Sequence, residues 1–470
     1  MSESTKSKQD DSGSRVESNE CQHPTPSGHP ICYRMQPDKQ MLSNVGNQTF
    51  ECPMHGSGPA PGINQMPPCL LSDQHHTVVD LDRVCRVALM VTPQPGGDAI
   101  DQAWEAVSTI RAILKQQPVP MAVTMQTVYV RSAEDVPAFR NLFQAYYGER
   151  MPTTSFIVQP PCEGQALAIE AWALGGEGVE IQFLSPDVVT VAYDGLRWIY
   201  AAGISSPDGM NGAYAESEYA FAQLANRLET AGASFRDVPR IWLYQGGITA
   251  SEQQQSGEQI ERYRELNRAR TDFFEQQKAI GRMVVSDHGN VCYPASTGIG
   301  TAGQGLTISC LALQTDRDDV RLQPLENPRQ TSAFDYARSF SAKSPKFSRA
   351  MAIVIGDYVT TWVSGTASIL DSESVHLGDA EKQTEQTIDN IERLISPENF
   401  ARHGLSGCGA QLADLAKVRV YVKHLEDYEK CRAVCQRRFG ALPIIFAQAD
   451  ICRGELLVEI EGVAFSSVGS

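Results

Sequence analysis

The stretches DLAKVRVYVK (residues 414–423) and ELLVEIEGVAF (455–465) flank the segment LEDYEKCRAVCQRRFG (425–440). Both flanking stretches are rich in β-branched and other apolar residues, which is typical of buried strands, whereas the segment between them has helical spacing. The preceding segment EKQTEQTIDNIERLI (381–395) also has helical spacing. This part of the chain therefore predicts the order helix, strand, helix, strand.

The same order occurs twice more toward the N-terminus, which indicates an internal repeat. In the middle of the chain it occupies residues 216–232, 237–245, 260–276 and 305–313. Nearer the N-terminus it occupies residues 98–114, 121–131, 136–148 and 166–174. Two strands joined by Asp194-Gly195 or Gly356-Asp357, both suited to hairpin turns, precede the later copies. Only RVCRVALMVTP (83–93) precedes the first copy, which predicts that this copy is truncated.

The repeat predicts an α+β fold of three tandem units, each a mixed sheet covered on one face by two helices. We place these units at residues 77–183, 184–320 and 321–470. Residues 1–76 are dominated by Ser, Gln, Pro and Gly without apolar periodicity, so we predict a disordered tail. This tail contains five of the nine histidines and four of the twelve cysteines, but their spacing does not match a structural zinc site. We therefore predict no metal.

The charge and composition exclude several classes of protein. With 40 Lys and Arg against 56 Asp and Glu, the formal charge is −16, and no basic run is present, so nucleic acid is disfavoured as a partner. No apolar stretch approaches the roughly 18 residues of a membrane helix, and the polar start MSESTKSKQDDSGS lacks a secretory signal, which predicts a cytoplasmic protein. The cysteines from Cys85 onward lie in apolar contexts, as reduced core thiols do.

Several motifs resemble the YjgF/RidA superfamily, most clearly VSGTAS (363–368), DLAKVRVYVKHLEDY (414–428) and LLVEIEGVAF (456–465). Within that superfamily, residues 85–467 resemble the chorismatases, enzymes that split chorismate. Further motifs that carry this resemblance are GISSPDGMNGAYAESEYAFAQL (203–224), RYRELNRARTDFF (262–274), YPASTGIG (293–300), ENPRQTSAFDYARSF (326–340), SPKFSRA (344–350), ESVHLGD (373–379) and ADICRGELLVEIEG (449–462).

Ordinary RidA-type imine deaminases bind a carboxylate with an Arg in the penultimate strand and carry a Glu in the final strand. The Arg position falls on Thr154, Ser296 and Ile444, none of which can bind a carboxylate ionically. The Glu position falls on Ala168, Thr307 and Glu459. Deaminase activity is therefore disfavoured, and we expect a single site built around Glu459 in the third unit.

Chorismatase chemistry would explain why one carboxyl group suffices. Hydrolysis of an enol ether starts with proton delivery to the terminal methylene carbon, which needs one acid whose pKa burial has raised. Strand alternation sends Glu459 and Glu461 to the same face, and we expect both to point into a cleft. The alternative is that Glu459 is a paired strand glutamate on a solvated face.

The resemblance also implies the groups that bind the substrate. Chorismate has two carboxylates, which favour arginines because a guanidinium can bind a carboxylate at two points. Arg453 matches the Arg of the family's CRxxLLVEIE run, and Arg349 and Arg270 are the next candidates. For Arg270 the alternative is a solvent-facing position, since Arg262, Arg264 and Arg268 crowd the same helix.

The remaining candidates orient the substrate or select the product. Tyr336 and Tyr263 match family tyrosines, although both are also suited to core packing. Gly365 and Ala367 in VSGTAS would let the substrate approach the backbone, the alternative being a tight strand end. The pair Gly365 and Cys452 resembles the chorismatase subgroup that forms 3-hydroxybenzoate; other members release a dihydroxycyclohexadiene acid.

RidA proteins are three-subunit rings with sites where neighbours meet. We therefore predict that the three units close into an intrachain pseudo-trimer within a monomer, with the functional cleft between the middle and third units. The mechanism requires no metal or other cofactor, only a small dicarboxylate substrate. The alternative function is a protein that binds an aromatic or keto acid without turnover, as a sensor. The net charge disfavours the ribonuclease role sometimes attached to the superfamily.

Overall fold

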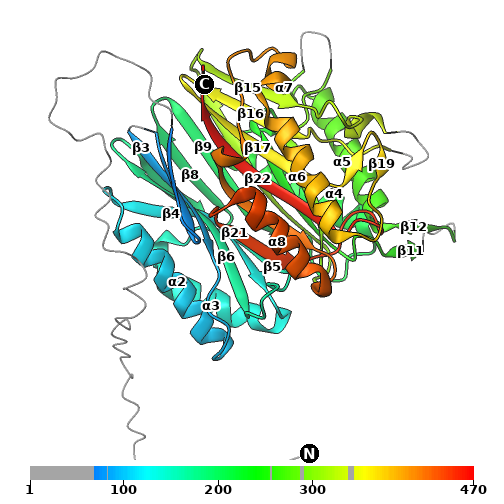
Figure 1. Ribbon diagram of the computed structural model, residues 1–470, viewed down its shortest axis with the longest axis horizontal. Coiled ribbons are helices and arrows are strands. Elements are labelled where there is room, and N and C mark those ends of the chain that lie inside the picture. Colours follow the sequence, from blue (N-terminus) through cyan, green and yellow to red (C-terminus); the bar gives the residue numbers. More distant parts are fainter. Residues whose placement is uncertain (1–67, 82, 254–256, 286–289, 337–342, 470) are drawn as a thin grey trace, which may run out of the picture. The chain divides into compact units, whose positions relative to one another are not determined.

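The computed structural model describes residues 68–81, 83–253, 257–285, 290–336 and 343–469. Within this part of the chain, three six-stranded mixed sheets have the same strand order (Figure 1). If the six strands are lettered a to f along the chain, each sheet has the spatial order a-b-c-f-d-e. In each sheet strand e is parallel to strand d and the other pairs are antiparallel.

The strands of the three sheets follow one another along the chain. The first sheet consists of β1 (Cys69–Ser72), β2 (His76–Asp80), β3 (Val84–Val91), β4 (Met121–Val130), β5 (Thr153–Val158) and β6 (Leu167–Gly176). The middle sheet consists of β7 (Glu180–Ser185), β8 (Val188–Tyr193), β9 (Leu196–Ser205), β10 (Arg240–Gly246), β13 (Ala295–Thr301) and β14 (Leu306–Thr315). The third sheet consists of β15 (Val320–Leu325), β16 (Ala350–Ile355), β17 (Tyr358–Ala367), β20 (Leu415–Val422), β21 (Ile444–Gln448) and β22 (Val458–Ser467).

Two long helices accompany each sheet, one before strand d and one after it. These are α2 (Ala99–Lys115) and α3 (Val136–Tyr147), then α4 (Ala213–Thr230) and α5 (Arg262–Ala279), then α6 (Ala380–Ile395) and α8 (Tyr428–Phe439). The short elements are α7 (Pro397–Arg402) and two small ribbons, β11 (Ser251–Gln253) with β12 (Gln259–Glu261) and β18 (Ile369–Leu370) with β19 (Glu373–Ser374). No helix in the described ranges is long and apolar enough to cross a membrane.

The predicted elements of the three copies are confirmed to within a few residues, but the N-terminal boundary is wrong. Residues 1–67, which include most of the predicted tail, lie outside the described residues. Strands β1 and β2, however, pair with each other, and β2 pairs with β3. A tail that extends to residue 76 is therefore wrong, and the first copy has its hairpin and is not truncated. Strand β7 pairs with β8, so the middle sheet begins at Glu180, inside the range placed in the first unit.

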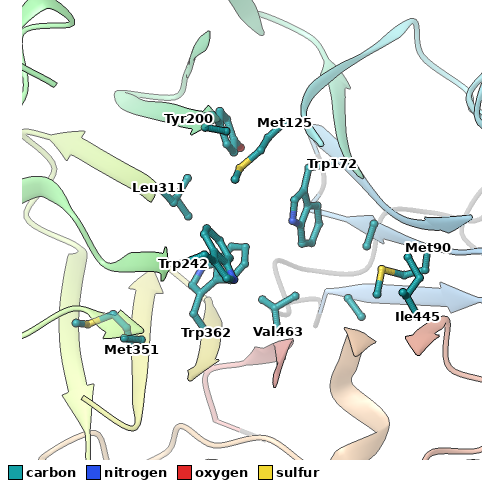
Figure 2. Close-up of a cluster of buried hydrophobic side chains, with 14 of the residues drawn as sticks. Met90, Met125, Trp172, Tyr200, Trp242, Leu311, Met351, Trp362, Ile445 and Val463 are labelled. Atoms are coloured by element: carbon teal, nitrogen blue, oxygen red, sulfur yellow. The ribbon is translucent and has the colours of Figure 1, made fainter. Parts of the chain in front are cut away.

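Each sheet is buried on both faces. One face packs against its two helices through a separate apolar core; in the third sheet, Ile388, Ile391 and Leu394 of α6 contribute to that core. The opposite faces of all three sheets share a central core, which Figure 2 shows. Because both faces of each sheet are covered, strands such as β20, LAKVRVYV, are buried at every position.

Tryptophans from different sheets meet in this central core. Trp362 of β17 makes edge-to-face contacts with Trp172 of β6 and Trp242 of β10, at 5.8 Å between ring centroids in both cases (Figure 2). The sheets also meet at their edges, because β5 contacts β9, β13 contacts β17, and β21 contacts β3. In every case strand e of one sheet lies against strand c of the next sheet, and strand e of the third sheet lies against strand c of the first. The three junctions therefore form a closed series.

Candidate active site

A cavity of about 310 Å³ is lined from both the middle and the third sheet, where we expected the cleft. The helix α5 and strand β13 contribute from the middle unit, and β17, β22 and the loop before β22 contribute from the third. All nine residues predicted from the sequence line this cavity: Glu459, Cys452, Arg453, Arg349, Arg270, Tyr336, Tyr263, Gly365 and Ala367. Folding thus brings together side chains that are as much as 196 positions apart, from Tyr263 to Glu459.

Glu459 is a buried acid in the middle of β22, between Ala367 of β17 and Tyr421 of β20. Its side chain is 4% exposed, so the alternative of a solvated strand face is wrong. Burial, together with the negative charge of Glu461, raises the pKa of Glu459 to about 8, although Arg240 and Arg349 oppose the shift. No described residue donates a hydrogen bond to its carboxyl group. Glu459 is therefore protonated at neutral pH and can donate that proton into the cavity.

Glu461 has the opposite environment, although it lies on the same face of β22. It forms ion pairs with Arg240 and with Arg419, the latter at 2.6 Å, and it accepts a hydrogen bond from Tyr421 at 3.0 Å. Despite burial, Arg419 and Arg240 hold its pKa below the usual value. Glu461 does not line the cavity, so the expectation that both glutamates point into it is wrong for Glu461. The two acids differ because, among the described residues, only Glu461 forms direct ion pairs with arginines.

Gly365 lies directly beneath the Glu459 carboxyl group. A Cβ atom at Gly365 would overlap Glu459 Oε1 and lie 2.9 Å from its Cδ. The backbone φ of Gly365 is not in the left-handed region, so a conformational requirement does not explain the glycine. We expected Gly365 to leave room for a substrate; in the structure the room above it is occupied by the acid.

Two buried arginines lie against the ring of Phe347. Arg270 and Arg349 are 2% and 4% exposed, and their guanidinium carbons lie 5.6 Å and 5.4 Å from the centre of the Phe347 ring. Among the described residues neither forms an ion pair with a carboxylate, and the Nε of each is buried without a hydrogen-bond partner. Burial lowers the pKa of Arg270. A buried guanidinium is costly unless an anion accompanies it, so this arrangement is suited to an anionic ligand.

The helix α5 explains why Arg270, unlike its neighbours, is buried. Tyr263, Asn267 and Arg270 lie at positions i, i+4 and i+7, so they share the face that lines the cavity. Arg268 is exposed on another face, and Arg264 is exposed where it lines the cavity. The alternative of a solvent-facing Arg270 is therefore wrong.

The remaining predicted residues complete the wall. Arg453 donates to the carbonyl of Ser372 at 2.9 Å and lies 5.3 Å from the Tyr336 ring, while the Tyr336 hydroxyl accepts from Arg349 at 2.5 Å. Burial raises the pKa of Tyr263 and raises that of Cys452 to about 12, with the nearby Glu459 adding to the latter shift. Cys452 is therefore a neutral thiol at physiological pH.

Ser296 of β13 is a cavity residue that the sequence did not single out. Its side chain is 5% exposed, and its hydroxyl is buried with no partner in the described structure. The alignment with RidA-type deaminases marks Ser296 only as a position that lacks their Arg. The signal in the sequence is that a polar residue occupies this ligand-binding position, since a hydroxyl can form hydrogen bonds with a ligand. Phe347 and Asn267 also line the cavity and were not predicted.

Strand registers agree with the alignment of the three copies. Ala168, Thr307 and Glu459 pair with Tyr129, Tyr244 and Tyr421, which occupy the same place on the three d strands. Thr154, Ser296 and Ile444 each pair with the strand d residue that lies three positions before the tyrosine of the same sheet. Only the third copy carries an acid at the aligned position.

Comparison with known proteins agrees with the fold and the site. A RutC family protein from Pyrococcus abyssi is 30% identical over 27% of this chain and 94% of its own length, which identifies the fold class as that of RutC proteins. Residues 172–312 match the family described as "Chorismatase FkbO/Hyg5-like, N-terminal". A 3-hydroxybenzoate synthase from Streptomyces hygroscopicus is 35% identical over 59% of this chain and 76% of its own length. The chain belongs to the chorismatase family. A crystal structure of a chorismatase has the same fold, with a TM-score of 0.58 and 22% identity, over 82% of this chain and all of its own.

Proposed function

We propose that this protein cleaves the enol ether of chorismate and releases pyruvate, with Glu459 as the general acid. One observation carries the proposal. A buried acid that holds its proton at neutral pH shares a cavity with two buried guanidinium groups that have no carboxylate partner among the described residues. The acid is suited to protonating an enol ether, and the two cations are suited to a substrate with two carboxylates. The names of the similar proteins, a 3-hydroxybenzoate synthase and a chorismatase, support the same substrate.

In the proposed reaction, the Glu459 proton moves to the terminal methylene carbon of the enolpyruvyl group. The ether oxygen stabilises the resulting oxocarbenium ion. Attack of water on that ion, followed by collapse, releases pyruvate and a dihydroxycyclohexadiene carboxylate. Alternatively, the neighbouring ring hydroxyl loses its proton and displaces the activated enolpyruvyl group, which leaves as pyruvate while the ring keeps an epoxide. Opening of the epoxide with transfer of a ring hydrogen then gives 3-hydroxybenzoate. No water is added or lost overall, because pyruvate and 3-hydroxybenzoate together contain the same atoms as chorismate. The ionised Glu459 regains its proton from water after release.

The arginines and tyrosines are proposed to orient the substrate. Arg270 and Arg349 each bind a substrate carboxylate beside Phe347, and Arg453 neutralises charge at the mouth of the cavity. Tyr336, fixed by Arg349, and Tyr263 donate hydrogen bonds to substrate oxygens.

We propose 3-hydroxybenzoate as the aromatic product. The pair of Gly365 and Cys452 is the basis for this choice, and the similarity to a 3-hydroxybenzoate synthase supports it. Because the pKa of Cys452 is about 12, its role is that of a neutral thiol beside the ring and not that of a nucleophile. Ala367, which pairs with Glu459 across the sheet, keeps the wall of the cavity close to the ring.

We also propose that the three sheets and their helices are tandem YjgF/RidA-like units that form an intrachain pseudo-trimer in a monomer. The identical strand orders, the equivalent registers and the closed series of junctions support this arrangement. The third unit supplies the acid, the middle unit supplies Arg270 and Tyr263, and the first unit completes the central core. Size measurement in solution would contradict the proposal if it returned an obligate homotrimer.

The test is incubation of the full chain with chorismate while pyruvate is followed by coupling to lactate dehydrogenase. We expect pyruvate from the wild type and none from Glu459→Gln, with chromatography identifying 3-hydroxybenzoate. The matched control is Glu218→Gln, the same substitution on α4 outside the cavity, which should leave the rate unchanged. If the wild type binds chorismate but releases no pyruvate, the proposal is wrong and a sensor is favoured.

A further inference from the structure

The hydroxyl group of Thr297, on strand β13 of the middle sheet, connects two features of the third unit. It accepts a hydrogen bond from the backbone N–H of Gly365 at 2.9 Å, and it donates to the carboxylate of Glu461. It also accepts from Arg240 Nη2 at 2.5 Å. A hydroxyl offers one donor and two acceptor sites, so every hydrogen-bonding position of Thr297 is used.

The consequence for the site follows from Gly365. Thr297 holds the Gly365 peptide, and this peptide lies beneath the Glu459 carboxyl group. The two are so close that a Cβ at Gly365 would overlap Glu459 Oε1. Thr297 is thus one contact away from the acid, although it does not line the cavity. We propose that Thr297 is a positioning residue for Glu459: clamped by Glu461 and Arg240, it fixes the Gly365 peptide on which the acid rests. This inference rests on the proposed function and extends it across the junction between two sheets.

The junction between the first and middle sheets offers an internal comparison. There Ser155 occupies the place of Thr297 in the strand registers, and its hydroxyl accepts from the backbone N–H of Gly203 at 2.9 Å. Ser309 stands in the place of Glu461 and shares a hydrogen bond with Ser155 at 2.8 Å. A hydrogen bond from a glycine backbone N–H to a side-chain hydroxyl is therefore common to both junctions.

Of these two junctions, only the one with the acid has the charged clamp. At the third junction Glu170 stands in the place of Glu461 and pairs with Lys417 and Arg419, but Ile445 stands in the place of Thr297 and has no hydroxyl to be held. Ser309 is neutral, whereas Glu461 is an anion held by Arg240, Arg419 and Tyr421. Thr307, in the place of Glu459, cannot act as an acid at neutral pH. The junction with Thr297 thus has both the clamp and the acid that the clamp would position. The junction with Ser155 has only the hydrogen bond to glycine and no acid. A purely structural role would predict equal importance of Thr297 and Ser155.

The experiment compares two substitutions that remove a buried hydroxyl, Thr297→Val and Ser155→Ala, with Thr297→Ser as the conservative variant. With chorismate as substrate we expect Thr297→Val to lower kcat by about tenfold or more, since small misplacement of a reacting group is costly. KM should stay within about twofold, because Thr297 does not contact the cavity. Thr297→Ser and Ser155→Ala should keep kcat within about threefold of the wild type. If Thr297→Val does not fold, Thr297→Ala serves in its place.

Three kinetic results would overturn the proposal. These are equal losses of kcat in Thr297→Val and Ser155→Ala, a change confined to KM, and a Thr297→Ser variant as impaired as Thr297→Val. Infrared spectroscopy provides a second readout that does not depend on turnover. The absorption of the protonated Glu459 carboxyl, identified by its loss in Glu459→Gln, should shift in Thr297→Val and not in Ser155→Ala. If the wild type releases no pyruvate, the proposed function fails, while an unchanged band in Thr297→Val overturns the positioning role separately.

Discussion

Replacing Glu459 by Gln should abolish turnover and at the same time stabilise the folded protein. The pKa of Glu459 rises from the ordinary value of 4.5 to about 8 on folding, because the site excludes water and places Glu461 nearby. At pH 7 an unfolded glutamate is ionised, and the folded protein must keep the group protonated. The difference of 2.5 pH units, at about 1.36 kcal/mol each, gives a cost of about 3 kcal/mol. Glutamine is neutral and does not incur this cost.

The dependence on pH has a definite sign. A raised pKa means that the folded state binds the proton more tightly, so this stabilising effect is complete below pH 4.5 and is lost as the pH rises toward 8. At pH 5.5 the same reasoning gives about 1.4 kcal/mol, roughly half the cost at pH 7. The stability advantage of Glu459→Gln should therefore grow by about 2 kcal/mol between pH 5.5 and pH 7.

The assay combines denaturant unfolding of both proteins at the two pH values with the rate of pyruvate release. The loss of a general acid typically lowers the rate by about 10²- to 10⁴-fold. In the wild type, kcat/KM should fall above about pH 8, because the acid form of Glu459 disappears there. A Glu459→Gln variant that is less stable than the wild type at both pH values, or whose advantage does not change with pH, would refute the reasoning.

Glu461→Gln is the matched control, two residues away on the same face of β22. Because Arg240 and Arg419 pair with Glu461, removing its charge leaves the buried Arg240 without a carboxylate partner in the described part of the chain, whereas Arg419 keeps Glu170. Breaking a buried pair in this way typically costs about 3–5 kcal/mol. The same substitution should therefore destabilise the protein at position 461 and stabilise it at position 459. If Glu→Gln changed the free energy of unfolding equally at both positions, the change in stability would depend on burial alone and not on the surrounding charges.

Three further predictions concern the walls of the cavity. Arg270→Met should raise KM by about 10- to 100-fold, because a charge-assisted hydrogen bond to the substrate is lost. The same substitution should raise the melting temperature of the ligand-free protein, because it removes a buried charge that has no carboxylate partner among the described residues. A lower melting temperature would contradict this reasoning. Cys452→Ala should change the ratio of aromatic to dihydroxycyclohexadiene product, measured by chromatography, and an unaltered ratio would exclude the thiol from product choice. Gly365→Ala should displace the Glu459 carboxyl and lower kcat more than it raises KM, whereas unchanged kcat would show that the carboxyl can move without consequence.

Much of the fold was readable from the sequence, because repeated periodicity is a local property of the chain. The alternation in LLVEIEG and the helical spacing of 381–395 and 425–440 determined the elements of the third unit. The hairpin strand β2, HTVVD, was missed because five residues with three polar or half-buried positions give too short a pattern. Its place in the sheet depends on pairing with β3, which no local signal reveals.

The candidate site divides in the same way. By itself the sequence established that one closing strand of three carries an acid at the aligned position, and it named the arginines by their motifs. It could not separate Glu459 from Glu461, which have the same alternation and differ only in what lies opposite. Arg240 and Arg419 reach Glu461 from β10 and β20, more than 40 residues away along the chain, whereas Glu459 faces the cavity. The pKa of a carboxyl depends on water and charge within a few ångströms, and only packing of the three sheets decides which groups are that close.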